Sequence, residues 1–142
     1  MALRLLVADD SPIVQRSIRD LLRTADLLSI VTAGTGTDAV RLAIETMPDV
    51  IILDYAMPGM NGIQAARLIH QAIPDVPLIL LTVNVAEYLI AAALNAGIRG
   101  YVLKADAGDD LVRAIDAVRG GSTYLSPGAC RVLYERYLPA SS

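Results

Sequence analysis

The side chains in this sequence that are best suited to take part in a reaction are Asp9, Asp10, Asp54, Thr82 and Lys104. Each follows a short apolar run. If those runs are neighbouring parallel strands, their carboxyl ends meet at one edge of a sheet and bring three carboxylates together. Carboxylates in close proximity repel one another, and a hard cation with oxygen ligands relieves the repulsion; Mg2+ is the natural candidate. Together with Lys104, such a cation would neutralise an incoming phosphoryl group while the Asp54 carboxylate attacks phosphorus. The predicted product is an aspartyl phosphate.

Each of these residues also has an ordinary structural interpretation. Asp54 is of a type that forms turns, Asp10 of a type that caps helices, Thr82 favours strands, and Lys104 alone would be a solvated lysine. The functional interpretation is favoured because four different strands would deliver these residues to the same edge.

The elements that must position these residues alternate along the chain as apolar runs and helical patterns, which is typical of βαβ units with a parallel sheet. The strands are predicted at Leu3–Ala8, Leu28–Thr32, Val50–Leu53, Pro77–Leu81 and Gly100–Leu103. The helices are predicted at Ile13–Leu22, Asp38–Thr46, Gly62–Ala72, Ala86–Asn95 and Asp109–Val118. In the doubly wound strand order 2-1-3-4-5, the first and third strands flank the switch point, where Asp9, Asp10 and Asp54 would converge.

Composition narrows the class of protein. The 142 residues have a hydrophobic fraction of 54% and a mean hydropathy of +0.49, but no apolar run approaches the roughly 20 residues of a membrane helix. The amino terminus lacks the apolar core of a signal peptide, and Cys130 is the single cysteine, so we expect a cytoplasmic protein without an internal disulfide. With a net charge of -3, the chain lacks the excess of basic residues that is typical of nucleic-acid-binding proteins.

In combination these residues resemble the receiver domain of two-component response regulators over about Leu3 to Gly121. The resemblance rests on Asp9-Asp10, Asp54 with Met57-Pro58-Gly59 and Gly62, Thr82, and Tyr101 followed by Lys104. It implies a flavodoxin-like (CheY-like), doubly wound (βα)5 three-layer sandwich, and a signalling protein as opposed to an enzyme with a free product.

The resemblance also implies a role for each matching residue. Asp54 would accept the phosphoryl group from a sensor histidine kinase. Mg2+ would be bound by Asp10 directly, by Asp9 mainly through water, by Asp54, and by the main-chain carbonyl of Ala56.

Three residues would respond to the phosphoryl group in this resemblance. Thr82 would hydrogen-bond a phosphoryl oxygen and Lys104 would pair with it. Tyr101 would turn from an exposed to a buried rotamer as the switch. The kinase would pack beside the first helix and the loop after Lys104.

The carboxyl end resembles the NarL/FixJ, or LuxR-type, group of transcriptional regulators, in which a linker helix and a helix-turn-helix domain follow the receiver. We therefore expect a receiver domain at residues 1–121 and, at residues 122–142, a linker with a helix at Pro127 to Tyr137 that Ser126 caps. The DNA-binding domain is absent from these residues, so DNA would be contacted only through a further domain. Phosphorylation would promote a homodimer. The alternative is a stand-alone receiver that controls a partner by protein contact.

Other classes of protein would require different residues at particular positions of this sequence. A flavin carrier of this topology would need a hydroxyl- and glycine-rich loop where Asp9-Asp10 stands, and a magnesium-dependent phosphatase typically has a second acid in place of Ala56. A degenerate receiver would lack part of the acidic cluster. Three residues depart from the receiver pattern. Ala56 offers no polar side chain, and Val83 is larger than usual after Thr82 and would narrow access to the phosphoryl group. Ala105 follows Lys104 where many receivers have proline, so the cis-proline bond of those members cannot form here.

Overall fold

The computed structural model describes residues 3–23 and 27–137, and in them strands and helices alternate as the hydrophobic pattern predicts. The strands are β1 (Leu3–Ala8), β2 (Leu27–Ala33), β3 (Val50–Asp54), β4 (Leu78–Thr82), β5 (Gly100–Leu103) and β6 (Tyr124–Leu125). The α-helices are α1 (Pro12–Leu22), α2 (Gly36–Thr46), α3 (Gly62–Ala72), α4 (Glu87–Asn95), α5 (Ala107–Arg119) and α6 (Pro127–Tyr137), with a short 3-10 turn, η1 (Lys104–Asp106), before α5.

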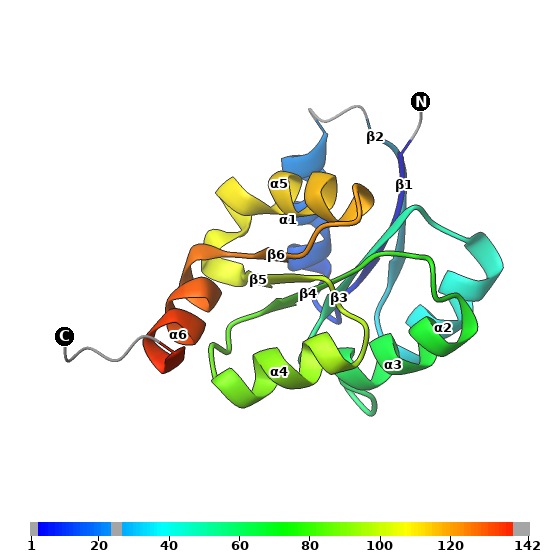
Figure 1. Ribbon diagram of the computed structural model, residues 1–142. Coiled ribbons are helices and arrows are strands. Elements are labelled where there is room, and N and C mark those ends of the chain that lie inside the picture. The colour runs from blue at the N-terminus through cyan, green and yellow to red at the C-terminus, as the bar shows by residue number, and fades with distance from the viewer. Residues whose placement is uncertain (1–2, 24–26, 138–142) are drawn as a thin grey trace.

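The strands form one parallel sheet in the order β2-β1-β3-β4-β5-β6, which confirms the predicted order 2-1-3-4-5 and adds a strand to it (Figure 1). Strand β1 lies between β2 and β3, where Leu6 pairs with Val31 on one side and with Ile51 on the other. All strand ends that carry the predicted site residues therefore lie along one edge of the sheet.

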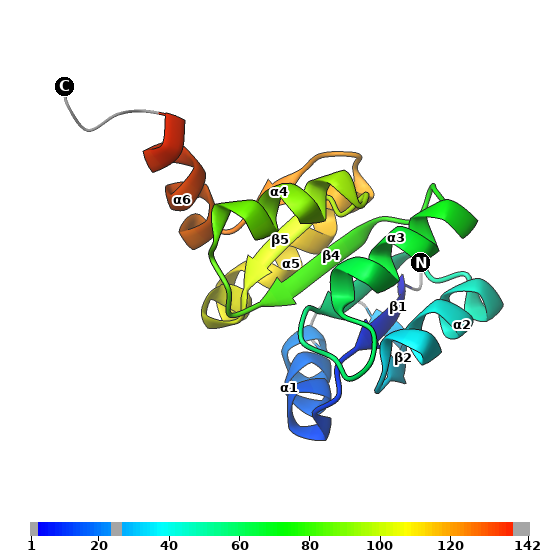
Figure 2. The ribbon, with the colours of Figure 1, turned by 90° about the horizontal axis from the view of Figure 1, so that it is seen from below.

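Both faces of the sheet are covered by helices, which explains why the central strands are apolar at almost every position. Every residue of β3 and β4 is buried. Helices α1 and α5 pack on one face, and α2, α3 and α4 cover the other (Figure 2). Two apolar cores result, one on each side of the sheet. No helix among the described residues combines the length and the hydrophobicity required to cross a bilayer.

Helices α1, α2 and α3 begin where a side chain satisfies free backbone N–H groups of the first turn. Ser11 accepts a hydrogen bond from Val14 N at the start of α1, and Thr35 accepts one from Asp38 N at the start of α2. At α3, Asn61 and Gln64 form a reciprocal capping box. These caps fix where α1, α2 and α3 begin, and therefore the length of the loops that precede these three helices at the functional edge.

The carboxyl-terminal segment is part of the sheet. Strand β6 pairs in parallel with β5, through Tyr124 N to Arg99 O at 2.8 Å and Ser126 N to Tyr101 O at 2.9 Å. The sequence patterns predict five strands and treat residues 122–142 as linker, so this sixth strand was not predicted. Residues 138–142 of that linker lie outside the described residues.

Helix α6 has the bounds of the predicted linker helix, and Ser126 stands at its N-cap position, where its carbonyl accepts a hydrogen bond from Cys130 N at 2.9 Å. The Ser126 side chain, however, bonds outside the helix. Ser126 is fully buried, and its hydroxyl accepts a hydrogen bond from Leu103 N at 3.1 Å. No bond from this hydroxyl to the first turn of α6 is present among the described residues. The Ser126 side chain therefore fastens the carboxyl-terminal segment to β5.

Candidate functional site

The three predicted carboxylates converge at the carboxyl edge of the sheet. Asp9 and Asp10 follow β1, Asp54 ends β3, and one oxygen from each lies within 4.8 Å of the others. Asp9 and Asp54 are almost wholly buried, with 1% and 4% exposed, whereas Asp10 is exposed. One side of the cluster is therefore shielded from water and the other is open to an incoming group.

Lys104, which follows β5, joins this cluster. Its Nζ lies 3.1 Å from Asp54 Oδ1 and 3.6 Å from Asp9 Oδ2. Burial opposes the charge on Lys104, but the hydrogen bond and the attraction from Asp54, followed by those from Asp9, outweigh it and raise the lysine pKa. Lys104 is therefore a cation held against two carboxylates.

Asp54 lies in an environment that disfavours its own negative charge. Burial, followed by repulsion from Asp9, raises the pKa of Asp54. Lys104 and a hydrogen bond from the Ala56 backbone partly offset this increase. A further cation beside these oxygens would stabilise the ionised form.

The residues present fit a hard divalent cation such as Mg2+. All the ligand atoms that the three acidic residues offer are carboxylate oxygens, which Mg2+ prefers. Asp9 Oδ1 accepts a hydrogen bond from Ser11 N at 2.8 Å, but Asp9 Oδ2 is buried and has no hydrogen-bond partner. A buried carboxylate oxygen without a donor is costly, and a cation or its water would satisfy it.

Thr82 and Tyr101 are joined through Asn84, a residue that no motif in the sequence indicated. Thr82 Oγ1 accepts a hydrogen bond from Asn84 N at 3.1 Å, and the Tyr101 hydroxyl donates to Asn84 O at 2.8 Å. The Asn84 side chain accepts a bond from Ala86 N at 2.8 Å, which tightens the loop before α4. An asparagine side chain that accepts from the N–H two residues further on is a common turn pattern, and Asn84 before a predicted helix could have drawn attention for this reason.

Tyr101 occupies the buried rotamer. Its side chain has no exposed surface, and burial, followed by the nearby Tyr55 and Tyr88, raises the pKa of its hydroxyl to about 12. Val83, beside Thr82, is 80% exposed, and Ala56 is exposed. The structure thus contains one of the two rotamers that the predicted switch requires.

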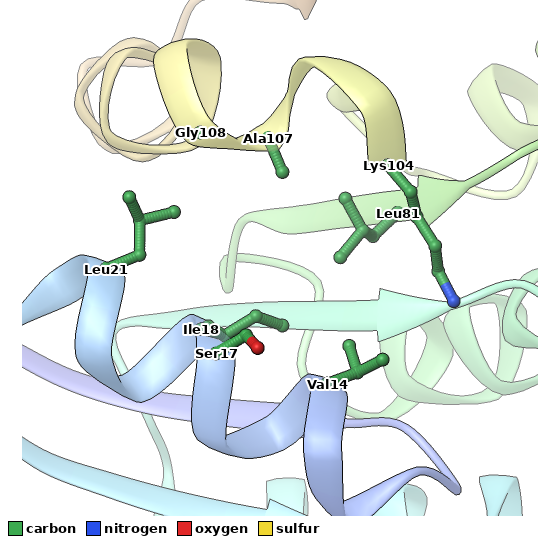
Figure 3. Close-up of a pocket in the computed structure, with 8 residues that line it drawn as sticks. All are labelled: Val14, Ser17, Ile18, Leu21, Leu81, Lys104, Ala107 and Gly108. Carbon is green, nitrogen blue, oxygen red and sulfur yellow. The ribbon is translucent and has the colours of Figure 1, made fainter.

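A groove lies beside the acidic cluster between α1 and the start of α5. It has a volume of about 340 Å3 and is mainly apolar. Figure 3 shows Val14, Ile18 and Leu21 of α1 facing Ala107, with Lys104 at one end of the groove. The groove therefore adjoins the site at Lys104.

Fold and site together define a doubly wound α/β protein with an acidic, lysine-containing site at the switch point of the sheet. Residues 5–116 match the model of the response regulator receiver domain. The chain belongs to this family, a class of signalling modules and not of catalysts.

The similar proteins are regulators of one kind. The chain is 34% identical over 126 residues to the transcriptional regulatory protein LnrK of Bacillus subtilis, and 33% identical over 126 residues to the response regulator GacA of Pseudomonas aeruginosa. These alignments cover 88% of this chain but only 57% and 59% of those two curated relatives. The chain therefore spans less than two thirds of their length.

A solved structure covers nearly the whole chain. The two-component response regulator of the LuxR family from Aurantimonas sp. SI85-9A1 superposes with a TM-score of 0.90 at 32% identity, and the match covers 96% of this chain and 99% of that one. The isolated receiver domain of RcsB from Salmonella enterica serovar Typhimurium, in the presence of the phosphomimetic BeF3-, has a TM-score of 0.84 at 28% identity, with 93% and 99% covered.

Proposed function

We propose that Asp54 accepts a phosphoryl group, and that Asp9, Asp10, Asp54 and the main-chain carbonyl of Ala56 hold Mg2+ during the transfer. The observation that carries this proposal is the position of Lys104 Nζ, 3.1 Å from Asp54 beside two further carboxylates. When bound, Mg2+ would supply the positive charge that a phosphoryl group needs in order to approach three carboxylates.

Asp54, Lys104 and Thr82 have different roles in the proposed phosphoryl transfer. An Asp54 oxygen attacks phosphorus, a new O–P bond forms, and the N–P bond to the donor histidine breaks, leaving its electron pair on the imidazole. Lys104 pairs with the negative phosphoryl oxygens as they arrive. The Thr82 hydroxyl donates a hydrogen bond to one of those oxygens. Its O–H is available for this because Thr82 Oγ1 is the acceptor in the bond from Asn84 N.

The switch would run through the loop that contains Asn84. Movement of Thr82 toward the phosphoryl group would pull Asn84, whose carbonyl holds the Tyr101 hydroxyl. Phosphorylation would thereby stabilise the buried rotamer of Tyr101 relative to an exposed one. A homodimer that forms on phosphorylation is the proposed consequence.

A sensor histidine kinase is the proposed phosphoryl donor, docked on the groove between α1 and α5. The groove is mainly apolar and adjoins Lys104. Helix α1, which lines one side of it, also carries Ile13, whose surface is 78% exposed. The proposed output is transcription, through a DNA-binding domain outside these residues, as in the relatives named as transcriptional regulators. A stand-alone receiver that controls a protein partner is the second candidate.

The experiment that tests the phosphoacceptor is intact mass after incubation with acetyl phosphate and Mg2+, for the native chain and for Asp54→Asn. We expect one hydroxylamine-labile phosphoryl group on the native chain and none on the variant. Omission of Mg2+, or addition of EDTA, should abolish the mass increase. Labelling of both proteins, or of neither, would contradict the assignment of Asp54.

A further inference from the structure

Gln15, on the first turns of α1, contacts the backbone that carries the acidic pair. Its side-chain Nε2 donates a hydrogen bond to Asp9 O at 2.6 Å and lies 3.5 Å from Ala33 O. The same Ala33 carbonyl accepts a bond from Asp9 N at 2.9 Å. One half-buried amide thus joins α1 to the carboxyl ends of β1 and β2.

The carbonyl that Gln15 binds belongs to the peptide unit that joins Asp9 to Asp10. A peptide unit is planar, so a bond to its oxygen also fixes the direction of the Asp10 N–H and Cα. The preceding peptide is fixed by Asp9 N to Ala33 O. The backbone on both sides of Asp9 is therefore held, and so is the starting point of the Asp10 side chain.

The Asp9 carboxylate is held as well. Its Oδ1 accepts from Ser11 N, which leaves the buried Oδ2 directed toward Lys104 at 3.6 Å. Asp10 is exposed and is not fixed by burial in this way. The angle between the two carboxylates consequently depends on the plane of the peptide between them, and Gln15 is the side chain that binds that peptide.

We propose that Gln15 is a positioning residue for the divalent cation, which sets the relative orientation of the Asp9 and Asp10 carboxylates by holding the carbonyl oxygen of Asp9. This inference rests on the proposed metal site. Mg2+ demands near-ideal octahedral geometry and tolerates misplaced ligands poorly, so a rotated peptide should weaken its binding. Residues that hold metal ligands in place typically contribute about 10- to 100-fold to affinity or activity.

The test compares Gln15→Met with Gln71→Met. Methionine has a similar length and helix propensity to glutamine but has no N–H donor, and Gln71 is an exposed residue of α3 away from the acidic cluster. Mn2+, which accepts the same oxygen ligands, reports binding directly by its EPR signal without any phosphoryl donor. We expect Gln15→Met to weaken Mn2+ binding by about tenfold, the lower end of that range, and Gln71→Met to leave it unchanged.

A second readout separates positioning from a loss of structure. The Mg2+ concentration that gives half-maximal phosphorylation by acetyl phosphate should rise by the same factor, while the rate at saturating Mg2+ approaches that of Gln71→Met. Unchanged Mn2+ affinity in Gln15→Met, with or without a lower Tm in EDTA, would overturn the proposal. If the native chain itself bound no Mn2+, the proposed metal site would fail with it.

Gln15→Asn is a second test of the proposal in case Gln15→Met does not fold. It retains the amide on a side chain one methylene shorter, which no longer reaches Asp9 O from the same backbone position. Weaker Mn2+ binding in this variant supports the proposal, and affinity equal to that of the native chain overturns it.

Discussion

Replacing Ser126 with alanine should destabilise the protein, because it removes the bond that fastens the carboxyl-terminal segment to β5. Ser126 is fully buried and accepts a 3.1 Å hydrogen bond from Leu103 N. In Ser126→Ala this N–H loses the partner that the Ser126 hydroxyl provides. The backbone bond from Ser126 N to Tyr101 O is retained, so the change isolates one donor.

The magnitude follows from the cost of leaving a buried donor unpaired, about 1–3 kcal/mol. We expect the lower part of that range, about 1–2 kcal/mol, because the bond is only partly buried. For a domain of this size that corresponds to a fall in Tm of roughly 3–8 °C. Thermal melts followed by circular dichroism would measure it, with Ser122→Ala, an exposed serine of the same segment, as the matched control.

Hydrogen exchange of the Leu103 amide tests whether the Ser126 bond is the cause of the expected destabilisation. If the bond fastens β6 to β5, the Leu103 amide should exchange faster in Ser126→Ala than in Ser122→Ala. A Tm equal to that of the control, together with unchanged protection of Leu103, would show that the segment is held by other contacts.

Three further perturbations test the site. Gly62→Ala places a Cβ against the Asp54 carbonyl oxygen and 2.9 Å from Leu80 Cδ1, so we expect about 1–3 kcal/mol lower stability and slower labelling by acetyl phosphate. Gly34→Ala, which has open space around it, is the control, and equal losses in both variants would argue against a specific clash. Because the pKa of Asp54 is raised, the metal-free protein loses stability as pH rises through that pKa, whereas Asp54→Asn does not. Melts in EDTA from about pH 4 to about pH 7.5 should show a Tm advantage of the variant that grows with pH and shrinks when Mg2+ is added; a constant difference would contradict the shift. Val83→Ala removes an exposed apolar side chain beside Thr82, and we expect faster loss of the phosphoryl group because water gains access; an unchanged decay rate of the labelled protein would dismiss the effect.

The sequence by itself determined the sheet and the membership of the site. Branched apolar runs that alternate with helical patterns favour buried parallel strands, and parallel strands place their carboxyl ends at one edge. Asp9, Asp10, Asp54 and Lys104 were therefore predicted to meet, and the structure brings them together. The roles of these residues in transfer remain predictions.

The hydrogen-bond partners of individual side chains were determined only by the tertiary structure. Ser126 before a proline predicts a helix cap, and Ser126 does stand at the N-cap position, yet its hydroxyl accepts from Leu103 N of β5 because the segment has joined the sheet. A two-residue strand such as β6 is too short to carry a periodic signal, so its pairing with β5 was invisible in the sequence. Likewise Gln15 resembles any polar residue on a helix. Its contact with Asp9 O exists because folding brings α1 against the ends of β1 and β2, a long-range event that no local pattern encodes.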